Sequence, residues 1–175
     1  MPIIKGLVIG FLLGVLLLAG GAYYYFASGM APAATADAPM PFEKKMAHMA
    51  LDAHIRKESV GQPAVPADEP TFIAGANVYQ GECSVCHGLP GQGSKYTTAM
   101  YPHPPQLFPG KGVSDDPASE TYWKVVNGIR LTGMPAFKNI LSDVQMWQVS
   151  QFLAHSNELP ASVSKLLAFE APGTK

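Results

Sequence analysis

Cysteine and charge are both scarce in this chain of 175 residues. The 12 basic residues nearly balance the 13 acidic ones, so no broadly charged surface attracts the chain to nucleic acid. The two cysteines, Cys83 and Cys86, lie three positions apart, which is too close in sequence for a disulfide that would staple a fold. No segment shows the alternating apolar and polar pattern of a β-strand, which fits a helical protein.

One long apolar stretch runs from Ile3 to Phe26 and is interrupted only by Lys5. About 20 such residues in a helix span a hydrocarbon core about 30 Å thick. The lysine near the start and the aromatic rings at the end predict an N-terminus in the cytoplasm. Residues 1–28 are therefore expected to be a single-pass anchor in the inner (cytoplasmic) membrane, with the rest of the chain on the periplasmic or outer side. A cleaved signal peptide is the alternative, since Ala34-Thr35-Ala36 offers a small-residue cleavage site.

Residues 29–70 are predicted to connect the anchor to a compact domain, because proline-rich segments at both ends favour extended chain. Between these segments, residues 42–59 carry apolar side chains at helical spacing and predict an amphipathic helix. Its two histidines, His48 and His54, are six positions apart and are interpreted as surface residues, since a shared metal favours a spacing of four.

The compact domain is predicted to occupy residues 71–159. Its first helix leads to the two cysteines, with Gly75 and Gly81 as small residues where another helix can cross closely. A second helix is predicted to begin with Asp116 as the N-cap and Pro117 as the first helical residue.

The last helix of this domain is predicted from Ser142-Asp-Val-Gln145, which has the sequence of a capping box. We expect this helix to cross the first one with Trp147 and Phe152 buried, and His155 near its end to face solvent. Residues 160–175 are interpreted as a tail whose short amphipathic pattern would allow docking on a partner or fraying.

The segment Cys83-Ser-Val-Cys86-His87 has the C-x-x-C-H spacing. Its two thiols, on one helical turn, can each add to a haem vinyl group, and the imidazole of the next residue can bind the iron. A structural zinc site would need a second pair of ligands, and a thioredoxin-like dithiol would need a βαβ surround, neither of which the sequence offers. The motif predicts one covalently attached haem c, with Cys83 and Cys86 as thioether links and His87 as an iron ligand.

Met134 is the predicted second axial ligand, because it lies between Gly133 and Pro135 in a loop whose glycine lets the backbone pass near the macrocycle. A methionine taken alone is more often a core residue, but its soft thioether also suits iron. Weaker candidates for this position are Met100, Met146 and His103.

Three further residues are candidates for the haem surround. Trp123 has an indole N–H that can donate to a haem propionate, and Arg130 can offset propionate charge. Pro105, together with Pro104, can form a rigid wall at the haem edge. Ordinary core and surface roles are equally open for Trp123 and Arg130.

The chain resembles the class I cytochrome c family, in particular the bacterial monohaem cytochromes that are similar to the haem domains of cbb3-type oxidases. The resemblance covers residues 71–159 and rests on Cys83-x-x-Cys86-His87-Gly88, Pro104-Pro105-x-Leu107, Gly128-Ile129-Arg130-x-Thr132-Gly133-Met134-Pro135 and a closing helix with Trp147. It implies an all-helical fold of about four helices around one haem, with His87 and Met134 as axial ligands. Residues 42–59 and 161–175 lie outside the pattern.

A haem with both axial positions filled changes oxidation state and binds no substrate, so we expect a one-electron carrier and not an enzyme with a small-molecule substrate. The anchor suggests a shuttle or a fixed subunit of a larger oxidoreductase complex in a respiratory or photosynthetic chain. Expected partners are the membrane and redox proteins, with a quinol-oxidising complex or dehydrogenase as donor and an oxidase or reaction centre as acceptor. The alternative is a haem peroxidase, or a gas or redox sensor, with a labile sixth ligand.

Overall fold

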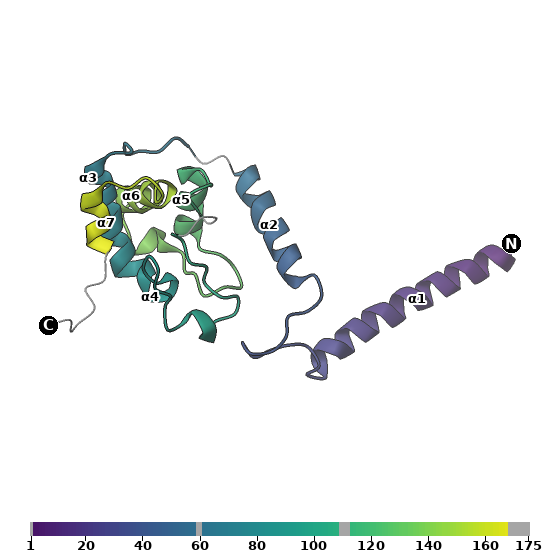
Figure 1. The fold of residues 1–175 in the computed structure, drawn as a ribbon. Coiled ribbons are helices and arrows are strands. Elements are labelled where there is room, and N and C mark those ends of the chain that lie inside the picture. The colour runs from purple at the N-terminus through teal and green to yellow at the C-terminus, as the bar shows by residue number, and fades with distance from the viewer. Residues whose placement is uncertain (1, 59–60, 109–112, 168–175) are drawn as a thin grey trace. The chain divides into compact units, whose positions relative to one another are not determined.

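The computed structural model describes residues 2–58, 61–108 and 113–167. Contacts divide the chain into two units, Met1–Met46 and Ala47–Lys175. Throughout the described ranges the regular structure is helical, and the only pairing of extended chain is an isolated bridge between Leu89 and Gln92 (Figure 1). The all-α expectation is confirmed.

The first unit contains α1 (Pro2–Ala27), a helix of 26 residues with none of them buried. By length and composition α1 could cross a membrane, although a signal sequence near an N-terminus has the same properties. The linker that follows forms a turn at Asp37, whose carboxylate accepts hydrogen bonds from the backbone N–H groups of Ala33 and Ala34, both at 2.8 Å.

The amphipathic helix expected at residues 42–59 is α2 (Glu43–Lys57), which contains the boundary between the two units. At its start the backbone N–H of Met40 donates to the carboxylate of Glu43 at 2.8 Å. None of the residues of α2 is buried. Residue 59 lies outside the described residues.

Two helices of the second unit, α3 (Glu69–Val78) and α6 (Asp143–Ala154), pack closely against each other (Figure 1). A side chain on Gly75 would place its Cβ 2.2 Å from the carbonyl oxygen of Gln148, so the contact requires a glycine there. The expected packing role of Gly75 is confirmed. The same expectation for Gly81 is wrong, because a Cβ at Gly81 would have no atom within 4 Å.

α6 begins with the predicted capping box. Ser142 Oγ accepts from the backbone N–H of Gln145 at 3.3 Å, and the Gln145 side chain accepts from the backbone N–H of Ser142 at 2.9 Å. Trp147 and Phe152 are buried, as expected from the spacing of the apolar residues.

His155 does not face solvent as predicted. It is half-buried, its ring lies 5.2 Å from the ring of Phe72, and its Nδ1 lies 2.9 Å from the carbonyl oxygen of Gln151. The expectation was wrong because the contact with α3 is not visible in the pattern of α6 alone.

α5 (Ala118–Asn127) begins one residue later than predicted. Pro117 is itself the N-cap residue, and no side chain caps this helix. The carboxylate of Asp116 instead accepts a hydrogen bond from Nζ of Lys124 at 3.1 Å, and the same Nζ binds Glu120 at 2.7 Å. The prediction for Asp116 and Pro117 is therefore wrong, because the lysine draws Asp116 away from the helix start.

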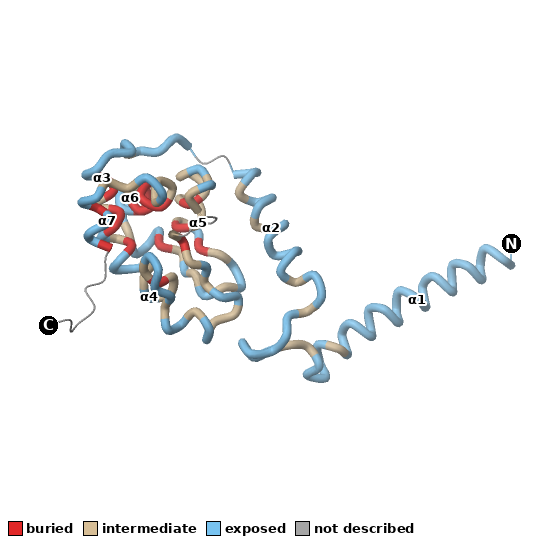
Figure 2. The backbone as a smooth tube through the Cα atoms, viewed as in Figure 1, coloured by how far each residue is buried: buried red, intermediate tan, exposed pale blue. Residues whose placement is uncertain are grey.

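The expected C-terminal tail contains α7 (Ala161–Leu167), which packs on α3. Val163 and Leu167 are buried in the core of the second unit, where α3, α6 and α7 meet (Figure 2). This part of the tail therefore does not fray. It packs within the chain itself, where it covers the core. Residues 168–175 lie outside the described residues.

Two hydrogen bonds fasten α7 to α3. Nε2 of Gln80, just beyond α3, donates to the carbonyl oxygen of Leu166 at 2.5 Å. The hydroxyl of Ser162 donates to the carboxylate of Glu69 at the start of α3. The two ends of α7 are thus tied to the two ends of the helix that leads to the cysteines.

Candidate functional site

The C-x-x-C-H motif is carried by the chain that continues α3. The carboxylate of Asp68 caps α3 by accepting from the backbone N–H of Thr71 at 3.0 Å. The helix then runs into η1 (Tyr79–Cys83), a π-helical turn, and into α4 (Ser84–His87). The motif is therefore helical throughout, and a π-helical turn of this kind is frequent at functional sites.

Cys83 and Cys86 are free thiols, and both are half-buried. Burial raises the pKa of Cys83 to about 12, with smaller contributions from the neighbouring Glu82 and Cys86. A redox-active dithiol needs a lowered pKa, because the thiolate is the nucleophile in disulfide exchange. The environment of Cys83 therefore disfavours a dithiol role.

His87 is oriented by one hydrogen bond, in which its Nδ1 lies 2.8 Å from the carbonyl oxygen of Pro105. Because a carbonyl can only accept, Nδ1 carries the proton and Nε2 keeps a free lone pair. Burial lowers the pKa of His87, while the hydrogen bond to Pro105 opposes this shift. The neutral imidazole that results is the form that binds a metal, and a metal-bound histidine usually has its second nitrogen fixed in this way.

The segment that contains Pro105 is itself fastened to the loop after the motif. Nε2 of Gln106 donates to the carbonyl oxygens of Leu89 at 3.1 Å and of Gln92 at 3.3 Å. Pro105 is exposed, so its ring is free at the surface while its carbonyl points to His87. Sequence reasoning selected Pro105 for its ring and missed the role of its carbonyl, which no residue type signals.

Tyr79 fixes the end of the motif and was also missed. Its buried hydroxyl donates to the carbonyl oxygen of Gly88 at 2.6 Å, and its ring packs against Phe108 and Phe152. Gly88 has a φ of +77°, and a Cβ there would collide with the backbone of the following loop. The glycine directly after His87 is therefore a requirement of this turn.

The loop that carries Met134 is closed on itself. The backbone N–H of Ile129 donates to the carbonyl of Met134 at 3.3 Å, and Thr132 Oγ1 donates to the carbonyl of Ile129 at 2.6 Å. The same Oγ1 accepts from the backbone N–H of Met134 at 3.1 Å. Gly128 opens the loop with a φ of +67°. Met134 and Cys83 are both half-buried and pack against the same buried core.

The weaker ligand candidates lie in three different environments. Met146 is buried in the core, and His103 is exposed. Met100 lies against the Met134 loop, because a Cβ on Gly133 would be 2.1 Å from its terminal methyl carbon. Gly133 thus makes room for the side chain of Met100 beside the Met134 loop.

Trp123 and Arg130, two of the candidates for the haem surround, lie in different environments in this structure. The indole N–H of Trp123 donates to the carboxylate of Glu58 at 2.5 Å. Arg130 is exposed, and within the described ranges no hydrogen bond or ion pair of its side chain is found. A haem propionate could accept the indole hydrogen bond of Trp123 only by replacing the carboxylate of Glu58. A haem contact of Trp123 or of Arg130 therefore stays a prediction.

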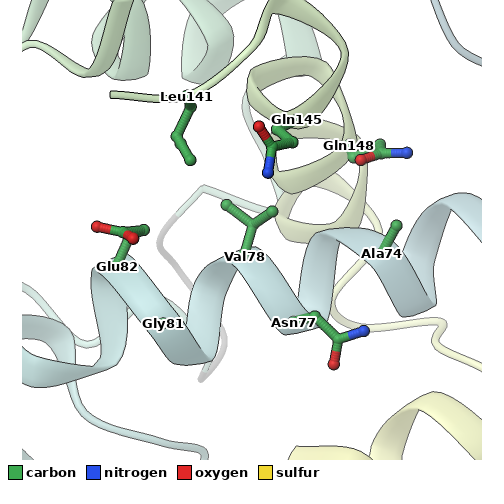
Figure 3. Close-up of a pocket in the computed structure, with 8 residues that line it drawn as sticks. All are labelled: Ala74, Asn77, Val78, Gly81, Glu82, Leu141, Gln145 and Gln148. Atoms are coloured by element: carbon green, nitrogen blue, oxygen red, sulfur yellow. The ribbon is translucent and has the colours of Figure 1, made fainter. Parts of the chain in front are cut away.

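An open groove of about 380 Å³ lies between α3 and α6 (Figure 3). The absence of a side chain at Gly81 widens it, and the amides of Gln145 and Gln148 face it from α6. Its lining is completed by Ala74, Asn77, Val78, Glu82 and Leu141. None of the four residues predicted to hold the haem lines this groove.

Comparison with known proteins gives one family and one structural likeness. The family model for cytochrome c oxidase, cbb3-type, subunit III matches residues 70–153. No curated protein sequence matches the chain. A solved structure from a reducing HAO-like protein complex of Kuenenia stuttgartiensis is 25% identical with a TM-score of 0.49, and the likeness covers 57% of this chain and 49% of that one. The chain therefore spans about half the length of that structure.

Proposed function

We propose that this chain is a membrane-tethered monohaem cytochrome c, because residues 70–153 match the family model of the cbb3-type cytochrome c subunit. A domain of this family carries haem c and transfers electrons. The proposal adds that one haem is present and that it passes single electrons in a respiratory or photosynthetic chain. The protein acts there as a shuttle or as a fixed subunit of a larger oxidoreductase complex.

The haem is held by Cys83 and Cys86 through thioether bonds and by His87 and Met134 at the iron. When bound, the iron supplies a one-electron change between the ferrous and ferric states. The observation that carries the proposal is the hydrogen bond of His87, because a proton held on Nδ1 by Pro105 keeps Nε2 available as a ligand. The closed loop presents Met134 from the same core.

Two axial side chains leave no free position at the iron, so the site is suited to electron transfer and not to bond chemistry. The exposed apolar side chains near the motif and the methionine loop support docking of a redox partner there. Leu131 has a strained backbone, with a φ of +61°, and its side chain is 88% exposed. Burial of this side chain therefore does little to offset the strain. We expect a quinol-oxidising complex or dehydrogenase as donor and an oxidase or reaction centre as acceptor.

The tether is α1, which crosses the inner membrane once and leaves the cytochrome domain on the periplasmic or outer side. Its length and its apolar surface, in which no residue is buried, support this assignment. A cleaved signal peptide would instead release the domain, and the mass of the mature protein distinguishes the two cases.

The test of the haem site is an absorption and magnetic circular dichroism spectrum of the haem-loaded protein in both oxidation states. The wild type and Met100→Leu should show the ferric methionine-to-iron charge-transfer band at the red end of the visible range. Met134→Ala should lose it, because its thioether is removed. Met100→Leu is the matched control, since Met100 lies beside the same loop.

Two results would overturn the assignment. Loss of the band in Met100→Leu, with retention in Met134→Ala, would make Met100 the ligand. A high-spin ferric iron in the wild type would mean that no methionine is bound at rest, and a peroxidase or sensor with a labile sixth ligand would then replace the electron carrier.

A further inference from the structure

α2 has two different faces. One of them, near the end of the helix, contacts α5 of the second unit. Glu58, directly after α2, lies with one carboxylate oxygen 3.0 Å from Nε2 of His54 and with the other 2.5 Å from the indole nitrogen of Trp123 on α5. The rings of His54 and Trp123 have centroids 5.5 Å apart. Leu51 and Ile55, on the same side of the helix, are half-buried.

The opposite face is apolar and has no cover. Met46 and Met49, three positions apart, form one stripe along α2, and Phe42 stands directly before the helix, four positions ahead of Met46. Their exposed fractions are 73%, 68% and 60%. Phe42 also has a φ of +65°, a strained conformation for an aromatic residue, and its ring is largely exposed in the part of the chain that the structure describes.

Basic side chains flank the stripe. At 100° per residue, Lys45 and Arg56 lie on one side of it and Lys57 on the other. α2 holds four of the chain's 12 basic residues and only two acidic ones, in a protein with a net charge of −1. An apolar stripe between long cationic side chains is the pattern of a helix that lies in the interface of an anionic bilayer.

The distance along the chain also suits a bilayer. The 15 residues from Ser28 to Phe42 separate α2 from the end of α1, and an extended segment of that length reaches roughly 45 Å. The turn at Asp37 shortens this reach. The length of the linker therefore allows α2 to reach the surface from which a spanning α1 emerges.

We infer that α2 lies on the anionic surface of the membrane that α1 spans, with Phe42, Met46 and Met49 at the acyl boundary and Lys45, Arg56 and Lys57 at the headgroups. This stripe with its basic flanks is the lipid face of α2. The inference rests on the proposed anchor, and its test uses the proposed haem attachment only to block Cys83 and Cys86. Because the other side of α2 contacts Trp123, the lipid face would hold the cytochrome domain at a fixed height above the bilayer.

The test uses the full haem-loaded chain in nanodiscs, in which thioether formation leaves an introduced cysteine as the single free thiol. A nitroxide is attached at Met49→Cys, and at Ala47→Cys as the matched control on the other side of the helix. Its collision rates with oxygen, which enriches in lipid, and with a water-soluble nickel chelate are compared. In discs with phosphatidylglycerol, the label at position 49 should be several-fold less accessible to nickel than the label at position 47.

Charge reversal tests the electrostatic part of the inference. Lys45→Glu, Arg56→Glu and Lys57→Glu together should make position 49 accessible to nickel, and discs of phosphatidylcholine alone should do so in part. Equal nickel accessibility at positions 47 and 49 in the anionic discs would overturn the inference. The discs contain no other protein. A stripe that docks on a protein partner and not on lipid would therefore also give equal nickel accessibility at positions 47 and 49.

A label at Leu16→Cys separates this inference from the proposed anchor. If position 16 is immersed and position 49 is not, the anchor stands and the lipid face is wrong. If both positions are accessible to nickel, α1 is not in the membrane and both proposals fall.

Discussion

Nδ1 of His87 lies 2.8 Å from the carbonyl oxygen of Pro105, which is 18 residues further along the chain. This contact predicts that the ring carries a proton on Nδ1 and none on Nε2, with or without iron. In ¹H–¹⁵N spectra of the diamagnetic ferrous protein, the Nδ1–H of His87 should exchange slowly with water. The exposed His103 serves as the internal comparison, and a protonated Nε2 on His87 would contradict the structure.

Gly75 and Gly81 should respond oppositely to alanine. Gly75→Ala places a methyl group 2.2 Å from the carbonyl oxygen of Gln148, so we expect a loss of about 1–3 kcal/mol in the free energy of unfolding. Gly81→Ala meets no atom within 4 Å and should be neutral or stabilising by up to about 1 kcal/mol. Denaturant unfolding of the two variants measures this difference, and equal losses would refute the close contact of α3 with α6.

Two adjacent leucines test whether α7 belongs to the core. Leu167 is 3% exposed and Leu166 is 41% exposed. Leu167→Ala should destabilise the protein by about 2 kcal/mol or more, because it empties buried volume. Leu166→Ala should change the stability by less than about 0.5 kcal/mol. The midpoint of unfolding in denaturant is the measurement, and two equally mild variants would mean that α7 is a loose tail after all.

The contact between Glu58 and Trp123 should depend on pH. The hydrogen bond from Trp123 lowers the pKa of Glu58, with a smaller contribution from His54, against a desolvation effect that raises it. A lowered pKa in the folded state means that the contact contributes fully above the ordinary pKa of a glutamate, and that this contribution is lost as the pH falls through the lowered value. The indole N–H signal of Trp123 should therefore titrate in acid.

Glu58→Gln should abolish that titration, because an amide does not ionise in this range. The buried Trp147 reports on global acid unfolding in the same spectra. A Trp123 signal that is constant in acid, or that moves only together with Trp147, would show that the carboxylate is not its partner.

Local patterns in the sequence predicted the features whose partners lie within one or two turns. The capping box of α6 joins Ser142 to Gln145, three residues away, and its chemistry is readable from residue types. The C-x-x-C-H motif is equally local. A glycine within a helical pattern pointed to a close contact at Gly75 and, equally, at Gly81, and the structure bears this out for Gly75 alone.

Features that depend on distant partners were not predictable in this way. Asp116 looked like an N-cap, but Lys124 on the next turns of α5 takes its carboxylate. The hydroxyl of Tyr79 reaches Gly88, and Trp123 meets Glu58 across 65 residues. No residue type announces such a pairing, because it depends on how the chain folds beyond the next turn and, for Trp123 and Glu58, on how separate helices come together. For the same reason the tail was not recognised as part of the core.

The fastening of α7 to α3 also sets an order of events during synthesis. Its two hydrogen bonds join residues 86 and 93 positions apart in sequence, so the side of α3 that α7 covers stays open until Leu167 has been synthesised. Until then, the core that partly buries Cys83 is incomplete. α7 therefore completes the core against which Cys83 packs only after the whole C-x-x-C-H motif has been made.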